Sequence, residues 1–319
     1  GNSSPSTPYT ANNAGEGPAW SNSLFEDNAE FGYGMLLAQQ AIRDGLKAKV
    51  EEVAANENAT AEVKAACQEW LDTFGVGATN GAATDKLVAA LENVDCPTCK
   101  DIVKNKDFLA KKSQWIFGGD GWAYDIGFNG VDHVLASGKD INIMVFNTEV
   151  YSNTGGQSSK ATPTGAVAQF AAGGKEVKQK DLAAIAMSYG YVYVAQISMG
   201  ADMNQTIKAI AEAEAYPGPS LIIAYAPCIN HGIKKGMAKA QTEEKLAVQS
   251  GYWNLFRFNP AAEGKKFSLD CKPATVDYQE FIKGEVRYTS LALKNRQELR
   301  SCLLRQSRML RISTLTLRS

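Results

Sequence analysis

The chain has 319 residues, with 33 Lys and Arg against 34 Asp and Glu, a formal net charge of -1 and an isoelectric point near 6.3. This balance gives no general reason to expect nucleic acid or an anionic membrane as a partner. No apolar run is long enough to span a bilayer, and no basic-then-apolar leader opens the chain. The six cysteines lack the pattern of a disulfide framework, which favours a reducing compartment.

The opening of the chain, residues 1–22, is a turn-rich stretch of Gly, Ser, Pro and Asn, and it does not begin with Met. We therefore expect a piece of a longer polypeptide. A helix is predicted to start near Leu24, capped by Asn22 or Ser23, with an apolar face that includes Phe31 and Leu36.

A second stretch, residues 48–112, is rich in Ala, Glu and Lys, with apolar residues at helical spacing and a predicted loop at residues 75–83. We expect a helical insertion that departs from a sheet. It contains Cys96-Pro97-Thr98-Cys99, a pair that could be half of a metal site or a redox centre. No second CxxC and no nearby His accompany the pair, which is predicted at the end of a helix, so we favour two ordinary cysteines.

The central stretch, residues 115–157, predicts one βαβ unit. Apolar runs at residues 115–117 and 141–146 are typical of buried parallel strands. Residues 127–137 have the length of a crossover helix, and Gly138 ends it. Both strands therefore finish at the same edge of a sheet, which is where α/β folds bind ligands.

Polar groups follow both of these strands. Asp120 comes directly after the first, and Thr148 directly after the second. A carboxylate, a hydroxyl and the backbone carbonyl of Val150 form an oxygen set that suits Mg²⁺, an ion that often shares its ligands with phosphate. Gly119 and Gly121 allow the backbone to approach a diphosphate closely. The sequence therefore predicts a magnesium and diphosphate site at this edge.

The following segments extend the same parallel sheet. Residues 154–164 predict a polar loop that could lie over a phosphate or a substrate. Asp181 is expected to cap a helix that reaches residue 189, followed by a strand at residues 191–197, a helix at 202–215 and a strand at 221–225.

The last of these strands delivers Cys228 and His231 to the sheet edge that carries Asp120. Taken alone, the two residues are interpreted as a small buried hydrophobe and a hydrogen-bonded surface histidine. A helix at residues 243–250 and an aromatic strand at 251–258 follow, and the pattern then fades. From Arg287 onward, arginines and apolar residues alternate as in an amphipathic helix, which we expect to pack against the rest of the protein.

Several of these stretches resemble one known family. Gly119-Asp120-Gly121, followed 28 residues after Asp120 by Thr148 in NTEVYSNTGGQ, is similar to the thiamine diphosphate and Mg²⁺ motif of pyruvate:ferredoxin oxidoreductases. In that family Thr stands where the general thiamine-enzyme motif has Asn. The resemblance covers residues 1–260 except near 45–112, through GPAWSNSLFEDNAEFGYGM, SSKATPTGAVAQFAAGGK, SYGYVYVAQISMGA, PGPSLIIAYAPCINHG and SGYWNLFRFNP.

The resemblance implies a thiamine diphosphate site at the sheet edge. Asp120, Thr148 and the Val150 carbonyl would hold Mg²⁺, and Asn153 would face the pyruvate-bearing end of the cofactor. The cofactor-binding residues that the family implies are Gly119, Asp120, Gly121, Trp122, Thr148, Glu149, Val150, Tyr151, Ser152 and Asn153.

The resemblance also implies that Cys228 is one of four thiolates of a 4Fe–4S cluster. The other three, and the Glu that activates the aminopyrimidine ring, belong to parts of the family outside this chain. The implied activity is oxidative decarboxylation of pyruvate to acetyl-CoA and CO₂, with electrons passed through iron–sulfur clusters to ferredoxin or flavodoxin. The implied protein is a homodimer in the cytoplasm or a hydrogenosome-type organelle, and its remaining domains would complete the site.

The predicted fold class is α/β, with a parallel sheet flanked by helices. One domain would span residues 1–260 with the helical insertion at 45–112, and an extension would span 261–319. We expect the chain alone to bind Mg²⁺ and thiamine diphosphate weakly and not to turn over pyruvate. Two alternatives stay open: another thiamine-dependent decarboxylase or transketolase-type enzyme, and a non-catalytic diphosphate-binding module.

Overall fold

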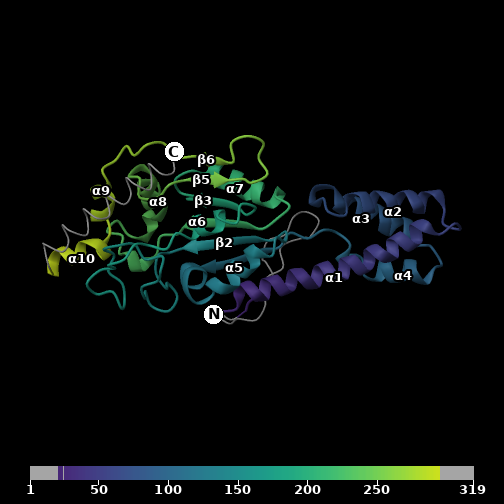
Figure 1. Cartoon of the computed structure of the whole chain (residues 1–319), viewed down its shortest axis with the longest axis horizontal. Helices are drawn as coiled ribbons and strands as arrows, with labels where there is room; N and C mark the ends of the chain where they lie inside the picture. The colour runs from purple at the N-terminus through teal and green to yellow at the C-terminus, as the bar shows by residue number, and fades with distance from the viewer. Residues whose placement is uncertain (1–20, 24, 295–319) are drawn as a thin grey trace. The chain divides into compact units, whose positions relative to one another are not determined.

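The computed structural model describes residues 21–23 and 25–294, with side chains up to Leu291 (Figure 1). Contacts within the chain define two compact units among the described residues: a helical unit, Gly32–Gln114, and a sheet unit, which combines the described residues up to Phe31 with residues 115–294. The predicted arginine-rich helix lies mostly outside the described residues, as does Cys302. None of the helices within this described part has both the length and the apolar character that a membrane crossing requires.

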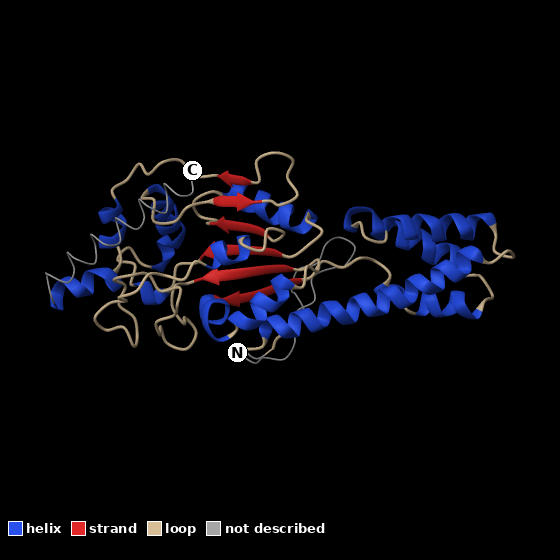
Figure 2. Ribbon diagram, viewed as in Figure 1, coloured by secondary structure: helices blue, strands red, loops and turns tan. Residues whose placement is uncertain are grey.

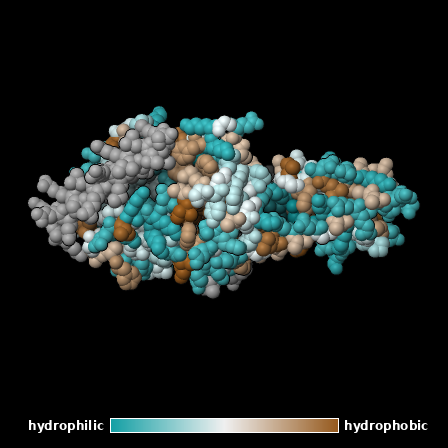
Figure 3. All heavy atoms as spheres, viewed as in Figure 1, coloured by the Kyte–Doolittle hydropathy of each residue, from teal (hydrophilic) through white to brown (hydrophobic). Residues whose placement is uncertain are grey.

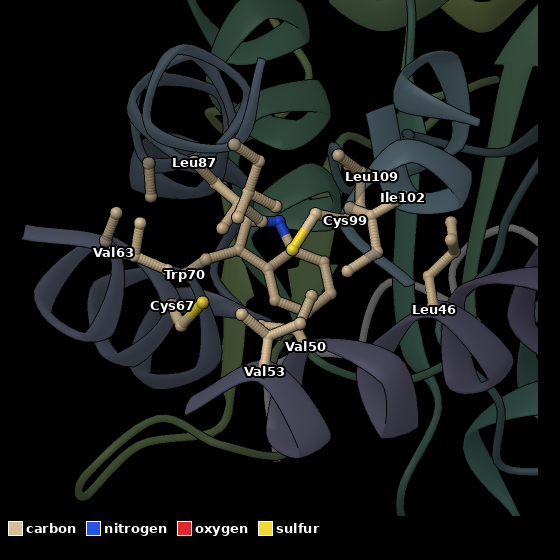
Figure 4. Packing of buried hydrophobic residues seen from close by; sticks show 13 residues of the cluster. Leu46, Val50, Val53, Val63, Cys67, Trp70, Leu87, Cys99, Ile102 and Leu109 are labelled. Carbon is tan, nitrogen blue, oxygen red and sulfur yellow. The ribbon is translucent and has the colours of Figure 1, made fainter. Parts of the chain in front are cut away.

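The helical unit packs its helices around a buried tryptophan. The described helices are α1 (Asn28–Ala55), which begins in the sheet unit, α2 (Ala61–Thr73), α3 (Gly77–Leu91) and α4 (Pro97–Lys104), followed by the short turn η1 (Lys106–Phe108). Trp70 is fully buried in a core with Val50 and Leu87 (Figure 4), and its indole Nε1 donates to Thr84 Oγ1 at 3.1 Å. On the face shown in Figure 3, hydrophilic residues cover most of this unit, because the apolar side chains point inward.

Three predictions for this region are wrong. The first helix starts at Asn28 and not near Leu24, and residues 77–83 belong to α3 and not to a loop. Tertiary packing decides the second case: Ala83, Leu87 and Leu91 lie at helical spacing on the core face, which outweighs the weak helix propensity of the Gly and Thr residues near the start of α3. The third error concerns the CxxC pair, which opens α4 and does not end a helix.

The sheet unit contains six described strands in the order β1-β2-β4-β3-β5-β6 (Figure 2). The strands are β1 (Trp115–Gly119), β2 (Asn142–Asn147), β3 (Tyr193–Ile197), β4 (Ser220–Tyr225), β5 (Phe256–Phe258) and β6 (Phe267–Leu269). The first four are parallel, as predicted, whereas β5 pairs antiparallel with β3, and β6 pairs antiparallel with β5. The sheet is therefore mixed and not purely parallel. The predicted strand at residues 251–258 shrinks to three residues, because Tyr252 and Trp253 turn into the core before β5 begins.

Helices cover this sheet and its carboxyl edge. They are η2, a π-helix (Gly121–Ile126), α5 (Phe128–Ala136), α6 (Leu182–Met187), α7 (Met203–Ala215), α8 (Ala240–Gln249), α9 (Tyr278–Lys283) and α10 (Val286–Lys294), with short turns η3 (Ile229–His231) and η4 (Met237–Lys239). As predicted, Asp181 caps α6, and Asp202 caps α7 in the same way: each carboxylate accepts a backbone N–H at 2.9 Å. Gly138 ends α5 with φ 66, a left-handed conformation that suits Gly.

Candidate functional site

The candidate site lies where three neighbouring parallel strands end. β2 lies between β1 and β4, and Figure 2 shows these strands pointing to the same edge. Asp120 follows β1, Thr148 follows β2, and Cys228 comes three residues after β4. The sequence predicted this convergence, and the sheet order adds that Thr148 arrives between the other two. The site is built entirely within the sheet unit.

Three oxygens meet at this edge. Thr148 Oγ1 lies 2.8 Å from Asp120 Oδ1 and 3.0 Å from the Val150 carbonyl oxygen. Thr148 has one hydroxyl proton for two acceptors, so one of the two contacts always lacks a donor. A cation among the three oxygens would satisfy all of them, which a single proton cannot do. The donor set of one carboxylate, one hydroxyl and one carbonyl fits Mg²⁺, because that ion completes its shell with water and phosphate oxygens.

The Asp120 carboxylate is buried at the end of β1. Its side chain is fully buried, and in the part of the chain that the structure describes no Lys or Arg nitrogen is paired with it. Burial raises the pKa of Asp120 to about 6, although hydroxyls of Ser159 and Thr148 donate to its two oxygens and oppose the shift. A buried carboxylate in this state is poised to accept a metal ion.

This pKa predicts how the stability of the ligand-free protein depends on pH. The pKa of Asp120 is higher in the folded state than in the unfolded state, so its contribution to stability is fully present below the unfolded pKa and is lost as pH rises through about 6. The free energy of unfolding of the wild type, relative to Asp120→Asn, should therefore fall between about pH 4 and pH 7, by about 3 kcal/mol at most. Urea unfolding of both proteins at several pH values measures this. A difference that stays constant with pH would contradict the assignment.

The polar loop at residues 154–164 supplies a second hydrogen-bond donor to Asp120, which the sequence did not predict. Ser159 Oγ donates to Asp120 Oδ2 at 2.6 Å. Thr162 holds the loop in place, because its Oγ1 donates to the Glu149 carbonyl at 2.6 Å and accepts from the Ser159 N–H at 2.8 Å. The spacing of Ser159 and Thr162, typical of a local hydroxyl-to-backbone turn, was the signal available in the sequence.

Glycines allow the backbone around Asp120 to pack closely on one side and remain open on the other. A Cβ added at Gly121 would lie 2.5 Å from Cδ1 of Tyr151, whereas a Cβ added at Gly119 would meet no atom within 4 Å. The Tyr151 ring therefore leaves no room for a side chain at position 121. Gly119 borders open space, as a backbone that approaches a diphosphate requires.

Gly121→Ala should destabilise the protein by about 1–3 kcal/mol, because the new methyl group overlaps the Tyr151 ring. Gly119→Ala is the matched control and should change the free energy of unfolding by less than about 0.5 kcal/mol. Denaturant unfolding of both variants measures the difference. Adding Tyr151→Ala to Gly121→Ala should remove the overlap; equal losses in Gly121→Ala and Gly119→Ala would contradict this explanation.

Glu149 holds the turn between Thr148 and Val150 in an unusual conformation. Its φ is 59, a left-handed value that costs a non-Gly residue about 1 kcal/mol or more. Its buried carboxylate forms an ion pair with Arg287 NH1 at 2.7 Å and accepts from the Tyr252 hydroxyl at 2.7 Å. The side chain of this residue is thus engaged in the protein interior, while its backbone links Thr148 and Val150, which both contribute an oxygen to the cluster.

A second buried contact joins the turn at residues 148–150 to the turn after β4. His231 is completely buried, so its interpretation as a surface histidine is wrong. Its Nε2 lies 2.6 Å from the Thr148 carbonyl oxygen, and its Nδ1 lies 3.6 Å from Glu285 Oε1. Burial alone would raise the pKa of Glu285, but the Arg287 guanidinium and His231 outweigh it and lower that pKa. Glu285 and Arg287 therefore stabilise both turns, a role that the sequence did not predict for either residue.

Cys228 reaches the same edge with its sulfur surrounded by hydrogen-bonding groups. It is 5% exposed; its Sγ lies 3.0 Å from Ser152 Oγ and accepts from the Asn230 N–H at 3.4 Å. Ser152 and Asn153 are exposed, in a loop that leaves the edge, and Trp122 is buried against the backbone of Gly118. The structure thus brings the predicted residues from Gly119 to Trp122 and from Thr148 to Asn153 to one edge.

The fold and this edge define a class of protein. Residues 103–224 match the family model described as "Thiamine pyrophosphate enzyme, C-terminal TPP binding domain". The match includes Asp120, Thr148 and Val150, and it ends inside β4, before Cys228. This stretch of the chain is therefore similar to the C-terminal domain of thiamine pyrophosphate enzymes.

Curated relatives narrow the class. The chain is 55% identical to the pyruvate-flavodoxin oxidoreductase of Klebsiella pneumoniae over 91% of its own length and 25% of the relative. The pyruvate:ferredoxin oxidoreductase of Moorella thermoacetica gives the same identity and coverage. The mitochondrial pyruvate dehydrogenase [NADP(+)] of Euglena gracilis is 48% identical over 90% of this chain and 16% of that protein.

The chain is thus a homologue of one segment of the pyruvate-flavodoxin and pyruvate:ferredoxin oxidoreductases, and it spans about a quarter of their length.

Proposed function

We propose that this chain is the part of a pyruvate:ferredoxin or pyruvate:flavodoxin oxidoreductase that holds the diphosphate of thiamine diphosphate through Mg²⁺. The observation that carries the proposal is the oxygen cluster at the ends of β1 and β2, in which Asp120 Oδ1 and the Val150 carbonyl oxygen each lie within 3.0 Å of Thr148 Oγ1. The names of the curated relatives supply pyruvate as the substrate and ferredoxin or flavodoxin as the electron acceptor. The family resemblance supplies the reaction, which is oxidative decarboxylation of pyruvate.

Different groups of residues would bind the metal, the diphosphate and the substrate end of the cofactor. The carboxylate of Asp120, the hydroxyl of Thr148 and the carbonyl of Val150 bind Mg²⁺, and Ser159 orients the carboxylate. The backbone of Gly119, Gly121 and Trp122 would bind the diphosphate. When bound, thiamine diphosphate supplies a carbanion that cleaves the bond between the keto carbon and the carboxylate of pyruvate. Asn153, which is exposed at the edge, faces the substrate end.

Cys228 is the candidate ligand for an iron–sulfur cluster that would accept electrons from the thiamine. We propose that its sulfur is one thiolate of a 4Fe–4S cluster, whose other ligands come from the remaining domains of the enzyme. Its position beside Thr148 on the same sheet edge would bring the cluster close to the thiamine. Those domains would also bind coenzyme A and the electron acceptor. The full enzyme would be a homodimer, in the cytoplasm or a hydrogenosome-type organelle.

Two measurements test this assignment. The chain alone, assayed anaerobically with pyruvate, coenzyme A and a viologen acceptor, should release no CO₂ above background, because it supplies one cluster thiolate. In the full-length enzyme, Cys228→Ser should lower the iron content while the thiamine diphosphate content stays unchanged. Robust pyruvate oxidation by the chain alone, or full iron content in Cys228→Ser, would contradict the proposal.

A further inference from the structure

The pair Cys96 and Cys99 opens a helix. Cys96 has an extended backbone, with φ -137 and ψ 131, and acts as the cap of α4, while Pro97 occupies the first helical turn. Proline is favoured there because its missing N–H would lack a helical partner. A CxxC pair at the start of a helix places its first sulfur beside free backbone N–H groups and the positive end of the helix dipole. The pair follows another helix and not a strand, so it is not part of a thioredoxin-like βαβ unit.

The first cysteine is the accessible member of the pair. Cys96 is half-buried, and its Sγ accepts from the Cys99 N–H at 3.4 Å. Hydrogen bonds from the backbone and side chain of Cys99 lower the pKa of the Cys96 thiol. A thiolate at this position is therefore stabilised where an incoming reagent can reach it.

The second cysteine is the protected member. Cys99 is 2% exposed and belongs to the core of the helical unit, together with Trp70 and Cys67 (Figure 4). Burial raises the pKa of the Cys99 thiol, so it stays protonated while Cys96 ionises. An exposed nucleophile followed three residues later by a shielded thiol is the arrangement in which the second sulfur resolves a bond formed by the first.

Polar contacts fix the helical turn that carries both sulfurs. Thr98 Oγ1 donates to Glu52 Oε1 on α1 at 3.2 Å, and Lys49 on α1 forms an ion pair with Asp101. The Lys100 N–H donates to the Cys96 carbonyl at 3.0 Å and closes the turn. The two sulfurs therefore stay close together without rearrangement of the core.

We propose that Cys96 and Cys99 form a redox-active dithiol, which oxidising disulfide compounds convert reversibly to an intramolecular disulfide. The site lies in the helical unit and is independent of the thiamine site. We do not propose that the two cysteines bind a metal ion. In the residues that the structure describes, no group of three His, Cys, Asp or Glu side chains is placed to hold one.

The reaction balances with one molecule of a disulfide such as oxidised glutathione. The Cys96 thiolate attacks one sulfur of the reagent, which forms a mixed disulfide and releases one thiolate. The Cys99 thiol then loses its proton to solvent and attacks Cys96 Sγ, which releases the second thiolate. Each thiolate takes up a proton, so the net reaction turns two protein thiols and one disulfide into one protein disulfide and two small thiols.

Mass spectrometry of the protein tests the proposal. After treatment with oxidised glutathione, we expect a peptide that contains the Cys96–Cys99 disulfide and has lost the mass of two hydrogen atoms. Cys99→Ser should instead retain glutathione on Cys96, because the resolving sulfur is absent. Before oxidation, Cys96 should react with iodoacetamide at least ~100-fold faster than Cys67, whose pKa burial raises to about 11.

Other outcomes would overturn the proposal. Retention of glutathione on Cys96 in the wild type would show that Cys99 does not resolve the mixed disulfide. Equal alkylation of Cys96 and Cys67 would show that the helix start does not activate the thiol. Cys271→Ser, a half-buried cysteine of the sheet unit, is the matched control and should leave both the disulfide and the alkylation rates unchanged.

Discussion

Asp120→Asn is expected to weaken the binding of thiamine diphosphate in the presence of Mg²⁺ by at least ~100-fold, since a metal ligand should matter more than the outer-shell partners whose loss costs 10–100-fold. The substitution keeps the size of the side chain and removes its charge. Ser159 and Thr148 can still form hydrogen bonds with the amide, so the loss reflects the missing carboxylate. Isothermal titration calorimetry of both proteins measures the change.

The same variant separates a binding defect from a folding defect. Burial disfavours the charged form of Asp120, so the ligand-free variant should be at least as stable as the wild type at pH 7.5. Asp132→Asn is the matched control, because this carboxylate on α5 accepts from the Tyr189 hydroxyl and takes no part in the oxygen cluster. It should leave binding unchanged. A variant at position 120 that binds as tightly as the wild type would exclude Asp120 as a ligand.

Arg287→Met is expected to cost about 3–5 kcal/mol of stability, because it leaves two buried carboxylates without their cation. Arg287 forms ion pairs with Glu149 and with Glu285, each at 2.7 Å, and all three side chains are almost completely buried. Denaturant unfolding measures the loss. Since Glu149 belongs to the turn that carries the Thr148 and Val150 oxygens, the variant should also weaken Mg²⁺-dependent binding.

Two further variants sharpen this prediction. Adding Glu149→Gln to Arg287→Met should recover part of the lost stability, because one of the unpaired charges disappears. Arg257→Met serves as the control, since that arginine pairs with Asp270 and Glu212 in a cluster that is partly open to solvent. Its loss of stability should be smaller. Similar losses in Arg257→Met and Arg287→Met would show that the buried network has no special role.

The sequence predicts well the parts of the fold that local patterns specify. Most residues of β2 and β4 are buried, so continuous hydrophobic stretches mark them as parallel strands, and the short apolar run of β1 has the same appearance in the sequence. Once the strands are parallel, the residues after them must meet at one edge. This is why Asp120 and Thr148 could be paired from the sequence before any contact between them was known.

Other features depend on contacts that no local pattern encodes. β5 and β6 have three residues each, too few for a period of two to emerge, and β5 pairs antiparallel with β3. Ser159 is one hydroxyl among many in a polar loop, and only the structure shows that it reaches Asp120. Likewise, the partner of Glu149 is an arginine in α10, in a stretch where the sequence pattern fades.

The most direct test of the central claim is a calorimetric titration of this chain with thiamine diphosphate, in the presence of Mg²⁺ and again with the metal removed by a chelator. The proposed site predicts one equivalent of cofactor bound with Mg²⁺ and an affinity at least ~10-fold lower without it, because the diphosphate reaches Asp120, Thr148 and Val150 through the metal. Binding of equal affinity with and without Mg²⁺, or no binding at millimolar cofactor with Mg²⁺, would contradict the assignment of these oxygens to a metal and diphosphate site.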